Sequence, residues 1–274
     1  MTTWPLSLML SLAAPADDTT MALAVQAVHA FQAGTEHLAD PGRARQSFRE
    51  AAQAMEQLRQ QGVRHPALER ALGNAWYLAG NLPRAILAYR RGLSLTPDDR
   101  AAHRNLAYVR EQVRYPDGGT LGRPPIDHRP PWLPRLNSPL GGASILAAVT
   151  VGSVALTRWR MTRRGPLRAV AALAWLAASL LTLGWLADAW QQGRDLETPP
   201  VVLATATPLR WGNGLAYPPK VATELPAGTE ARLLHRRGHW LLIELSGGEV
   251  GWVPATAALV ADDLADPARA SPAP

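Results

Sequence analysis

Residues 73–97 read GNAWYLAGNLPRAILAYRRGLSLTP, a pattern typical of two short helices joined by a tight turn. Gly80 and Asn81 supply the tight turn, because glycine adopts backbone conformations that other residues avoid, and Pro97 ends the second helix. Gly73 and Ala85 have the smallest side chains, which lets two antiparallel helices pack closely. The stretch therefore predicts a helical hairpin.

The same hairpin has the spacing of a repeat unit. Residues 66–99 resemble a tetratricopeptide repeat, with Glu69 where tryptophan is usual, and the matching positions are Leu72, Gly73, Trp76, Gly80, Ala85, Tyr89, Gly92 and Pro97. Residues 25–58 fit a second unit through Phe31, Ala44, Phe48 and Ala51. A further helix is expected from Arg100 to Arg114, capped by Asp98 and Asp99. We expect an α-helical tetratricopeptide repeat domain over residues 17–114.

A stack of such repeats offers a concave groove for a partner. In this register Arg70, Asn74 and Tyr77 face the groove, with Asn105 adjacent on the next helix. An arginine beside two asparagines resembles the carboxylate clamp of some tetratricopeptide domains, which holds the C-terminus of a peptide. The alternative is that these residues only decorate the surface of a common repeat.

Two uncharged stretches, residues 140–157 and 169–187, follow farther along the chain. Roughly 20 apolar residues in a helix span the hydrocarbon layer of a membrane. The alternative is a pair of buried helices in a soluble protein, but such helices normally carry a polar stripe, which neither stretch has. We therefore expect two transmembrane helices, with small residues such as Gly152 allowing close approach.

The connection between these stretches, residues 158–168, reads RWRMTRRGPLR. Short arginine-rich loops stay on the cytoplasmic side of a membrane, so both flanking regions should be extracytoplasmic. Binding of anionic lipid is a second use of the cluster, whereas nucleic-acid binding is disfavoured by the apolar flanks. The predicted location is the cytoplasmic (inner) membrane with both soluble domains extracytoplasmic, and the topology residues are Arg158, Arg160, Arg163, Arg164 and Arg168.

The remaining connections follow from composition. Residues 1–16 resemble a signal peptide that ends in Ala-Pro-Ala, although no basic residue precedes the apolar part. Residues 115–139 carry seven prolines and predict an extended spacer, with a ligand for an SH3 or WW module as the alternative. Residues 188–200 are expected to be a linker, and residues 262–274 a disordered tail.

Residues 201–261 change to short alternating strands separated by glycine-containing turns. This region resembles a bacterial SH3 domain, which implies a small all-β barrel. The resemblance rests on the order of three features: a strand after Pro-Ala-Gly, then Gly-His-Trp, then Gly-Gly-Glu-Val-Gly-Trp-Val-Pro. Trp211, Tyr217 and Trp240 are candidates for an aromatic peptide-binding groove. We expect Trp252 to lie in the core.

The sequence offers little for catalysis. It has no cysteine, which excludes disulfides, thiolate metal sites and a cysteine nucleophile. His235 and His239 could approach across a hairpin, but two histidines without an acidic ligand make a weak metal site. The net charge is +6, carried almost entirely by arginine. We predict a protein that is not an enzyme and that uses no cofactor or metal.

The order of signal peptide, repeats, membrane hairpin and SH3 domain resembles the BatE-like proteins of bacterial aerotolerance (Bat) operons. The resemblance implies partners with von Willebrand A domains, beside a MoxR-type ATPase, in an aerotolerance or envelope-stress complex. The expected function is therefore a membrane-anchored adaptor or scaffold. One alternative is a cell-wall module that binds peptidoglycan and recruits a hydrolase. Another is a cytoplasmic sensor with inverted topology.

Overall fold

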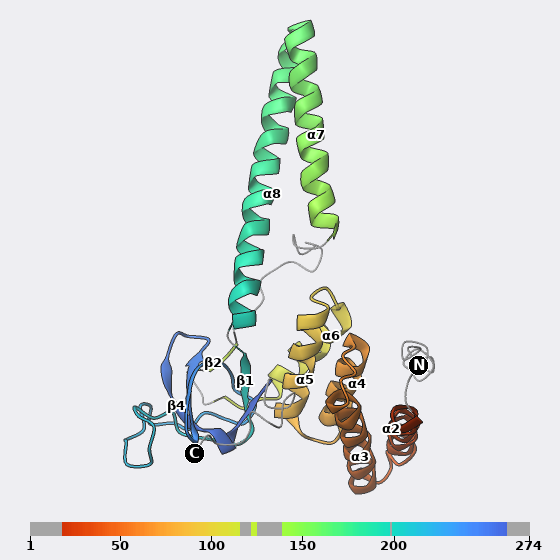
Figure 1. Ribbon diagram of the computed structural model, residues 1–274, viewed down its shortest axis with the longest axis vertical. Coiled ribbons are helices and arrows are strands. Elements are labelled where there is room, and N and C mark those ends of the chain that lie inside the picture. The colour runs from red at the N-terminus through yellow and green to blue at the C-terminus, as the bar shows by residue number, and fades with distance from the viewer. Residues whose placement is uncertain (1–17, 116–121, 125–138, 198, 262–274) are drawn as a thin grey trace. The chain divides into compact units, whose positions relative to one another are not determined.

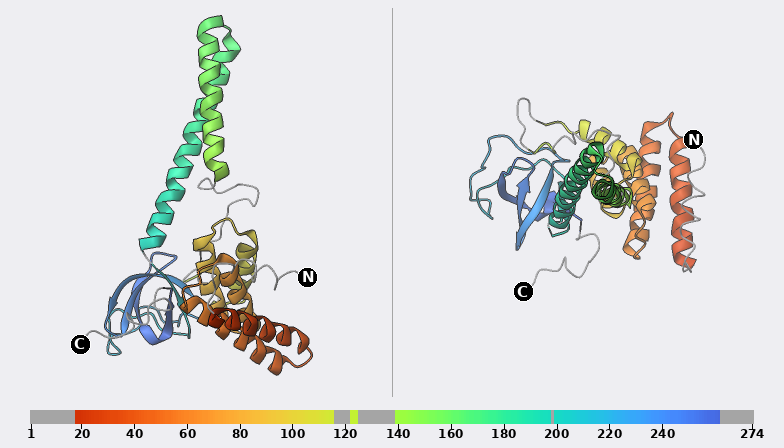
Figure 2. Two further views of the ribbon diagram at one scale, coloured as in Figure 1. Left: turned by 45° about the vertical axis from the view of Figure 1, so that its right-hand side comes forward. Right: turned by 90° about the horizontal axis from the view of Figure 1, so that it is seen from above.

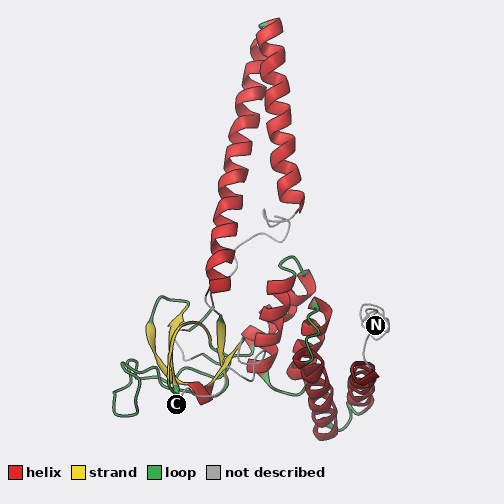
Figure 3. Cartoon of the chain, in the orientation of Figure 1, coloured by secondary structure: helices red, strands yellow, loops and turns green. Residues whose placement is uncertain are grey.

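The computed structural model describes residues 18–115, 122–124, 139–197 and 199–261, with the backbone alone for 139, 140 and 188–197. The predicted signal peptide, most of the proline-rich linker and the predicted tail lie outside these residues. The chain divides into two units, one formed by residues 1–125 with 198–274 and the other by residues 126–197. Helices and one small antiparallel sheet make up the described elements (Figures 1 and 3).

Helices of the first unit form what we call the helical stack, the elements α2 to α6 (Figure 1). Side chains at three N-termini, Asp40, Asn81 and Asp99, accept hydrogen bonds from the first amide groups of the helix that follows. The capped ends and the glycine turn at Gly80, with φ +82°, confirm the predicted hairpin. The helix bounds are α2 Asp18–Glu36, α3 Pro41–Gln60, α4 Pro66–Leu78, α5 Leu82–Leu95 and α6 Arg100–Glu111.

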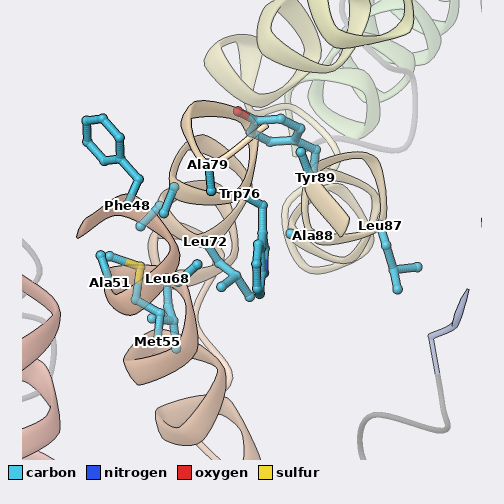
Figure 4. Close-up of a cluster of buried hydrophobic side chains, with 14 of the residues drawn as sticks. Phe48, Ala51, Met55, Leu68, Leu72, Trp76, Ala79, Leu87, Ala88 and Tyr89 are labelled. Atoms are coloured by element: carbon cyan, nitrogen blue, oxygen red, sulfur yellow. The ribbon is translucent and has the colours of Figure 1, made fainter. Parts of the chain in front are cut away.

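Close packing inside the stack depends on small residues, as predicted. A Cβ atom on Gly73 would lie 2.5 Å from the ring of Tyr89, so α4 and α5 approach only because Gly73 has no side chain. Gly34 has the same relation to Phe48, whose ring meets Phe31 edge-on at 5.2 Å. Trp76 lies among the other buried side chains of this core (Figure 4). The stack is thus held by interdigitated apolar side chains.

Glu69 of α4 is buried in an ionic cluster. Its Oε2 accepts a hydrogen bond from Arg91 Nε at 3.0 Å, and Arg91 Nη2 lies 3.7 Å from Glu56 Oε2. Arg59 donates to the other oxygen of Glu56 at 2.7 Å. Burial raises the pKa of Glu69, against the opposing effect of Arg91. The ion pairs of this cluster join α3, α4 and α5.

The second unit is a hairpin of α7, Pro139–Thr162, and α8, Gly165–Glu197 (Figure 2). Residues Gly141–Thr162 and Gly165–Ala187 are long and apolar enough to cross a membrane. The two helices pack closely at Gly152, where a Cβ would lie 2.9 Å from the Trp175 ring. Both helices expose aliphatic side chains, among them Leu146, Val154, Leu173, Leu176, Leu180 and Leu183. Such a surface supports membrane association.

Two predicted connections proved wrong. The loop expected over residues 158–168 is reduced to Arg163 and Arg164, since α7 continues to Thr162 and α8 begins at Gly165. The linker expected over 188–200 is mostly helical, because α8 runs to Glu197. Arginine is a good helix former, so charge ends the apolar stretch without ending the helix.

The five-stranded antiparallel sheet, which we call the sheet module, has the strand order β4-β3-β2-β1-β5. Left-handed glycines lie at the predicted turns, Gly228, Gly238 and Gly248. Leu241, Ile243 and Leu245 are buried on one face, as the alternation predicted. The strands are β1 Pro200–Leu203, β2 Glu230–Arg237, β3 Trp240–Leu245, β4 Val250–Pro254 and β5 Ala258–Val260, with a 3-10 turn at Ala255–Ala257.

The expectation that Trp252 is a core residue was wrong. Its neighbours Gly251 and Val253 are buried, so Trp252 points to the opposite face of β4, where it is half-buried across from Leu242. Gly251 instead fits against Leu209, to which a Cβ would come within 2.5 Å.

Candidate functional site

The predicted groove residues are half-buried and lie on one face, formed by α4 and α6, which we call the α4/α6 face. Arg70 of α4 forms an ion pair with Asp99, the residue that caps α6. Asp99 uses its other oxygen to accept the amide hydrogens of Ala101 and Ala102 at 2.9 and 3.1 Å. Burial alone would raise the pKa of Asp99, but the Ala102 amide and Arg70 outweigh it and lower the pKa. The guanidinium predicted to bind a ligand carboxylate therefore already holds one.

Asn74 lies one turn farther along α4 and is also engaged. Its Oδ1 accepts hydrogen bonds from the Tyr89 hydroxyl at 2.6 Å and from Asn105 Nδ2 at 2.9 Å. Burial raises the pKa of Tyr89, so this hydroxyl remains a donor across the physiological range. The predicted proximity of Asn74 and Asn105 is confirmed, and the contact links α4, α5 and α6.

Tyr77 completes the row one turn beyond Asn74. Its ring meets that of Tyr108 edge-on, with centroids 5.6 Å apart and an interplanar angle of 76°. A side-chain hydrogen bond with Tyr108 raises the pKa of Tyr77. Tyr108 is 53% exposed and was not predicted as a site residue, although it follows Asn105 by about one helical turn. The row therefore consists of three cross-helix pairs, ionic, amide and aromatic.

The second group of predicted site residues is only partly brought together. Trp211 and Tyr217 come from one loop of the sheet module, where Trp211 is 62% exposed and Lys220 Nζ lies 4.9 Å from its ring centroid. Gly212 fits against the Tyr217 ring. Trp240 instead begins β3, opposite Arg237 and Pro254. Within the described residues no ring contact or hydrogen bond joins Trp240 to the loop.

A buried charge that the sequence did not reveal joins the helical stack to the sheet module. Glu230, at the start of β2, has a side chain only 2% exposed. Arg110 of α6 donates to both of its carboxylate oxygens, at 2.6 and 2.8 Å, and Arg90 of α5 donates at 2.7 Å. Burial would raise the pKa of Glu230, but hydrogen bonds from Arg110 and the charges of both arginines outweigh it and lower the pKa. We call this arrangement the Glu230 junction.

Apolar contacts surround the Glu230 junction. Val202 of β1 is fully buried and belongs to the core of the helical stack. A Cβ on Gly228 would lie 2.8 Å from Val113 and 3.4 Å from Ile86, so the turn before β2 fits closely against the helices. The stack and the sheet module therefore fold as one body, although residues 126–197 separate them in the sequence.

The predicted topology arginines surround the tip of the hairpin. All five are exposed, and none forms an ion pair in the part of the chain that the structure describes. Arg163 adopts a left-handed conformation with φ 54° and closes the turn. The guanidinium carbons of Arg163 and Arg168 lie 5.9 and 5.8 Å from the ring centroid of Trp159.

Candidate metal ligands are sparse. His235 and His239 are both exposed, His235 in β2 and His239 in the β2–β3 turn. No group of three histidine, aspartate or glutamate side chains among the described residues is arranged to hold a metal ion. No protein-family model, curated protein or solved structure matches the chain.

Proposed function

We propose that this protein is a membrane-anchored adaptor that binds protein partners through the α4/α6 face. The observation that carries the proposal is the row of Arg70–Asp99, Asn74–Asn105 and Tyr77–Tyr108 pairs. The row combines a guanidinium, amides and a half-exposed aromatic pair, which are the groups that bind extended peptides. The helical pairs and their packing support a tetratricopeptide-like array, and the strand order supports an SH3-like module.

The Glu230 junction supports one soluble body beside the membrane rather than two tethered domains. A hairpin that crosses the membrane twice returns the chain to the side on which it started. Both halves of the junction must lie on that same side, since Arg90 and Arg110 precede the hairpin and Glu230 follows it. We propose that this side is extracytoplasmic, because the five arginines at the hairpin tip favour the cytoplasm.

Partners of this body are proposed to be envelope proteins, including membrane proteins with von Willebrand A domains, as the resemblance to BatE-like proteins implies. The ligand chemistry fits an acidic or C-terminal peptide segment. Arginine binds a carboxylate through two parallel hydrogen bonds, and the adjacent amides add further donors and acceptors.

The test starts with co-purification from detergent-solubilised membranes and identification of the partner by mass spectrometry. Its acidic or C-terminal peptide is then titrated by calorimetry against the full chain and the Arg70→Gln variant. Loss of a hydrogen bond to a charged group costs about 1.5–3 kcal/mol, so we expect at least roughly tenfold weaker binding. Arg43→Gln is the matched control, because Arg43 is exposed on α3 away from the α4/α6 face. Equal affinity of wild type and Arg70→Gln contradicts the proposal.

A substitution of Asp99 provides a second test, in which tighter rather than weaker peptide binding is expected. Asp99 occupies Arg70 and competes with any incoming carboxylate. Asp99→Asn keeps a side-chain oxygen to cap α6 but removes the competing charge. Tighter peptide binding by Asp99→Asn is expected, and unchanged affinity indicates that Arg70 does not receive the ligand.

One observation favours a second candidate function, a cell-wall module. Trp211 and Tyr217 are both exposed on one loop beside Lys220, and exposed rings of this kind can pack on sugars. Co-sedimentation of the full chain with purified peptidoglycan sacculi, compared with a Trp211→Ala, Tyr217→Ala variant, tests this function. Sedimentation that depends on the two rings supports peptidoglycan binding, and no sedimentation excludes it.

A further inference from the structure

The tip of the hairpin carries a cationic cluster with no internal counter-charge. Residues 141–187 contain five arginines and no acidic residue. All five side chains are exposed, and within the described residues none is held by a carboxylate. Exposed guanidinium groups with no internal carboxylate stay free to bind an external anion by charge-assisted hydrogen bonds.

Trp159 organises part of the cluster. Arg163 lies in the turn and Arg168 lies near the start of α8, and both guanidinium groups lie within 6 Å of the indole centroid of Trp159. The left-handed backbone of Arg163 directs the chain back toward α8. Two cations that repel one another are thereby held near one ring, an arrangement that a bound anion would stabilise.

The surroundings of the cluster identify the type of anion. Met161 is 80% exposed beside the arginines, and aliphatic side chains cover both helices below them. A shallow depression on α7, lined by Ser153, Val154, Thr157 and Arg158, leads from this apolar surface to the basic tip. Indole rings and arginines at the end of an apolar helix lie at the level of lipid headgroups. The nearest anions there are phosphates that carry acyl chains.

We propose that the hairpin tip is a binding site for anionic phospholipid, with the headgroup phosphate held by Arg163 and Arg168 and an acyl chain along the depression below Arg158. The site is independent of the α4/α6 face. Each arginine near an anionic surface contributes about 1 kcal/mol, equivalent to roughly fivefold in affinity.

Native mass spectrometry of the full chain in a mild detergent tests the proposal, because orientation in a membrane does not affect this measurement. The chain is titrated with phosphatidylglycerol and with phosphatidylcholine of identical acyl chains. We expect tighter binding of phosphatidylglycerol by about tenfold or more. Arg163→Gln with Arg168→Gln should reduce that preference at least about fivefold. The control pair Arg114→Gln with Arg237→Gln removes the same charge from exposed sites outside the hairpin and should leave the preference unchanged.

Inorganic phosphate distinguishes a lipid site from a free-phosphate site. If phosphate at the same concentration as the lipid leaves phosphatidylglycerol bound, the acyl chain contributes as proposed. Equal binding of the two lipids, displacement by phosphate, or an equal loss in the control pair overturns the proposal.

Discussion

Arginine is used in two opposite ways in the two units of this protein. At the Glu230 junction, Arg90 and Arg110 hold a single buried carboxylate and close the space between the helical stack and the sheet module. At the hairpin tip, five arginines are exposed, and among the described residues none pairs with an acid. In the first arrangement, a carboxylate of the protein itself accepts the hydrogen bonds of the arginines. The second leaves the guanidinium groups exposed, where we propose that they bind lipid headgroups.

The difference shows that the surroundings of a charge, rather than its type, decide its role. A carboxylate buried with two arginines remains ionised, as the lowered pKa of Glu230 indicates. Glu69 is buried with one strongly bonded arginine and has a second acid, Glu56, nearby, and its pKa is raised. For both acids burial raises the pKa, and the hydrogen bonds and charges of the neighbouring arginines outweigh burial at Glu230 but not at Glu69.

The largest effect is expected at the hairpin tip. Replacing all five arginines with glutamine should remove the orientation signal. A C-terminal alkaline phosphatase fusion, which is active only outside the cytoplasm, should be active on the wild-type chain and lose most of that activity on the variant. The same five positions changed to lysine provide the control, since lysine retains the charge. Full activity of the glutamine variant rules out the topological role.

A second large effect is expected at the Glu230 junction. Glu230→Gln leaves two arginines facing a neutral group, and breaking a buried ion pair from one side costs about 3–5 kcal/mol. We expect the lower end, since the side chains of Arg90 and Arg110 are about a quarter exposed. Thermal unfolding of the full chain in detergent, followed by near-ultraviolet circular dichroism, measures the loss.

Two comparison variants make the Glu230 result specific. Glu224→Gln makes the same chemical change at an exposed position of the sheet module and should leave unfolding unchanged. The triple change Arg90→Met, Arg110→Met, Glu230→Met should recover much of the loss, because an apolar contact can replace a buried ion triad. If Glu230→Gln is as stable as Glu224→Gln, the two modules are not joined as described.

The opposite pKa shifts of Glu230 and Glu69 predict opposite effects of pH. Glu230 has a folded-state pKa below 4.5, so its contribution is present at neutral pH and is lost as the pH falls through the folded-state value. Glu69 has a folded-state pKa above 4.5, so its contribution to stability decreases as the pH rises from 4.5 through the folded-state value. With Glu230→Gln, the melting temperature should therefore fall less on acidification than in the wild type. With Glu69→Gln, it should fall more. Profiles from pH ~3.5 to ~7 that change in the same direction disprove the contrast.

The smallest effect on stability is expected for the Arg70–Asp99 pair. Both groups are partly exposed, and such pairs contribute about 0–1 kcal/mol. Arg70→Gln should therefore change the unfolding temperature only slightly while it weakens peptide binding. A loss comparable to that of Glu230→Gln, measured in the same unfolding experiment, would assign Arg70 a structural role instead.

Local patterns in the sequence were enough to predict most of the elements. Glycine and proline at the ends of helices located the helical hairpin around Gly80. The alternation of apolar and polar residues located the strand whose buried side chains are Leu241, Ile243 and Leu245. The uncharged stretches located α7 and α8, although not their ends, because arginine does not terminate a helix. Trp252 was misplaced because a core position was judged more frequent for it than a binding surface. Side chains alternate between the two faces of a strand, and in β4 the buried face belongs to Gly251 and Val253.

Only those parts of the candidate site whose residues lie close together in the sequence could be predicted. Arg70, Asn74 and Tyr77 share a helix face by spacing alone, and Asn105 follows from the repeat register. Asp99 was recognised as a cap, but its second oxygen and the ion pair with Arg70 depend on how α6 packs. Glu230 pairs with arginines 120 and 140 residues away, and no local pattern encodes that distance.

The central claim, that the α4/α6 face binds a protein partner outside the cytoplasm, is tested most directly by photocrosslinking in intact cells. A photoreactive phenylalanine analogue replaces Tyr108 in the full chain, and replaces the exposed Leu95 of α5 as a control. We predict a discrete adduct with an envelope protein from position 108 that is absent from position 95 and reduced when Arg70→Gln is added. No adduct from position 108, or the same adducts from both positions, contradicts the claim.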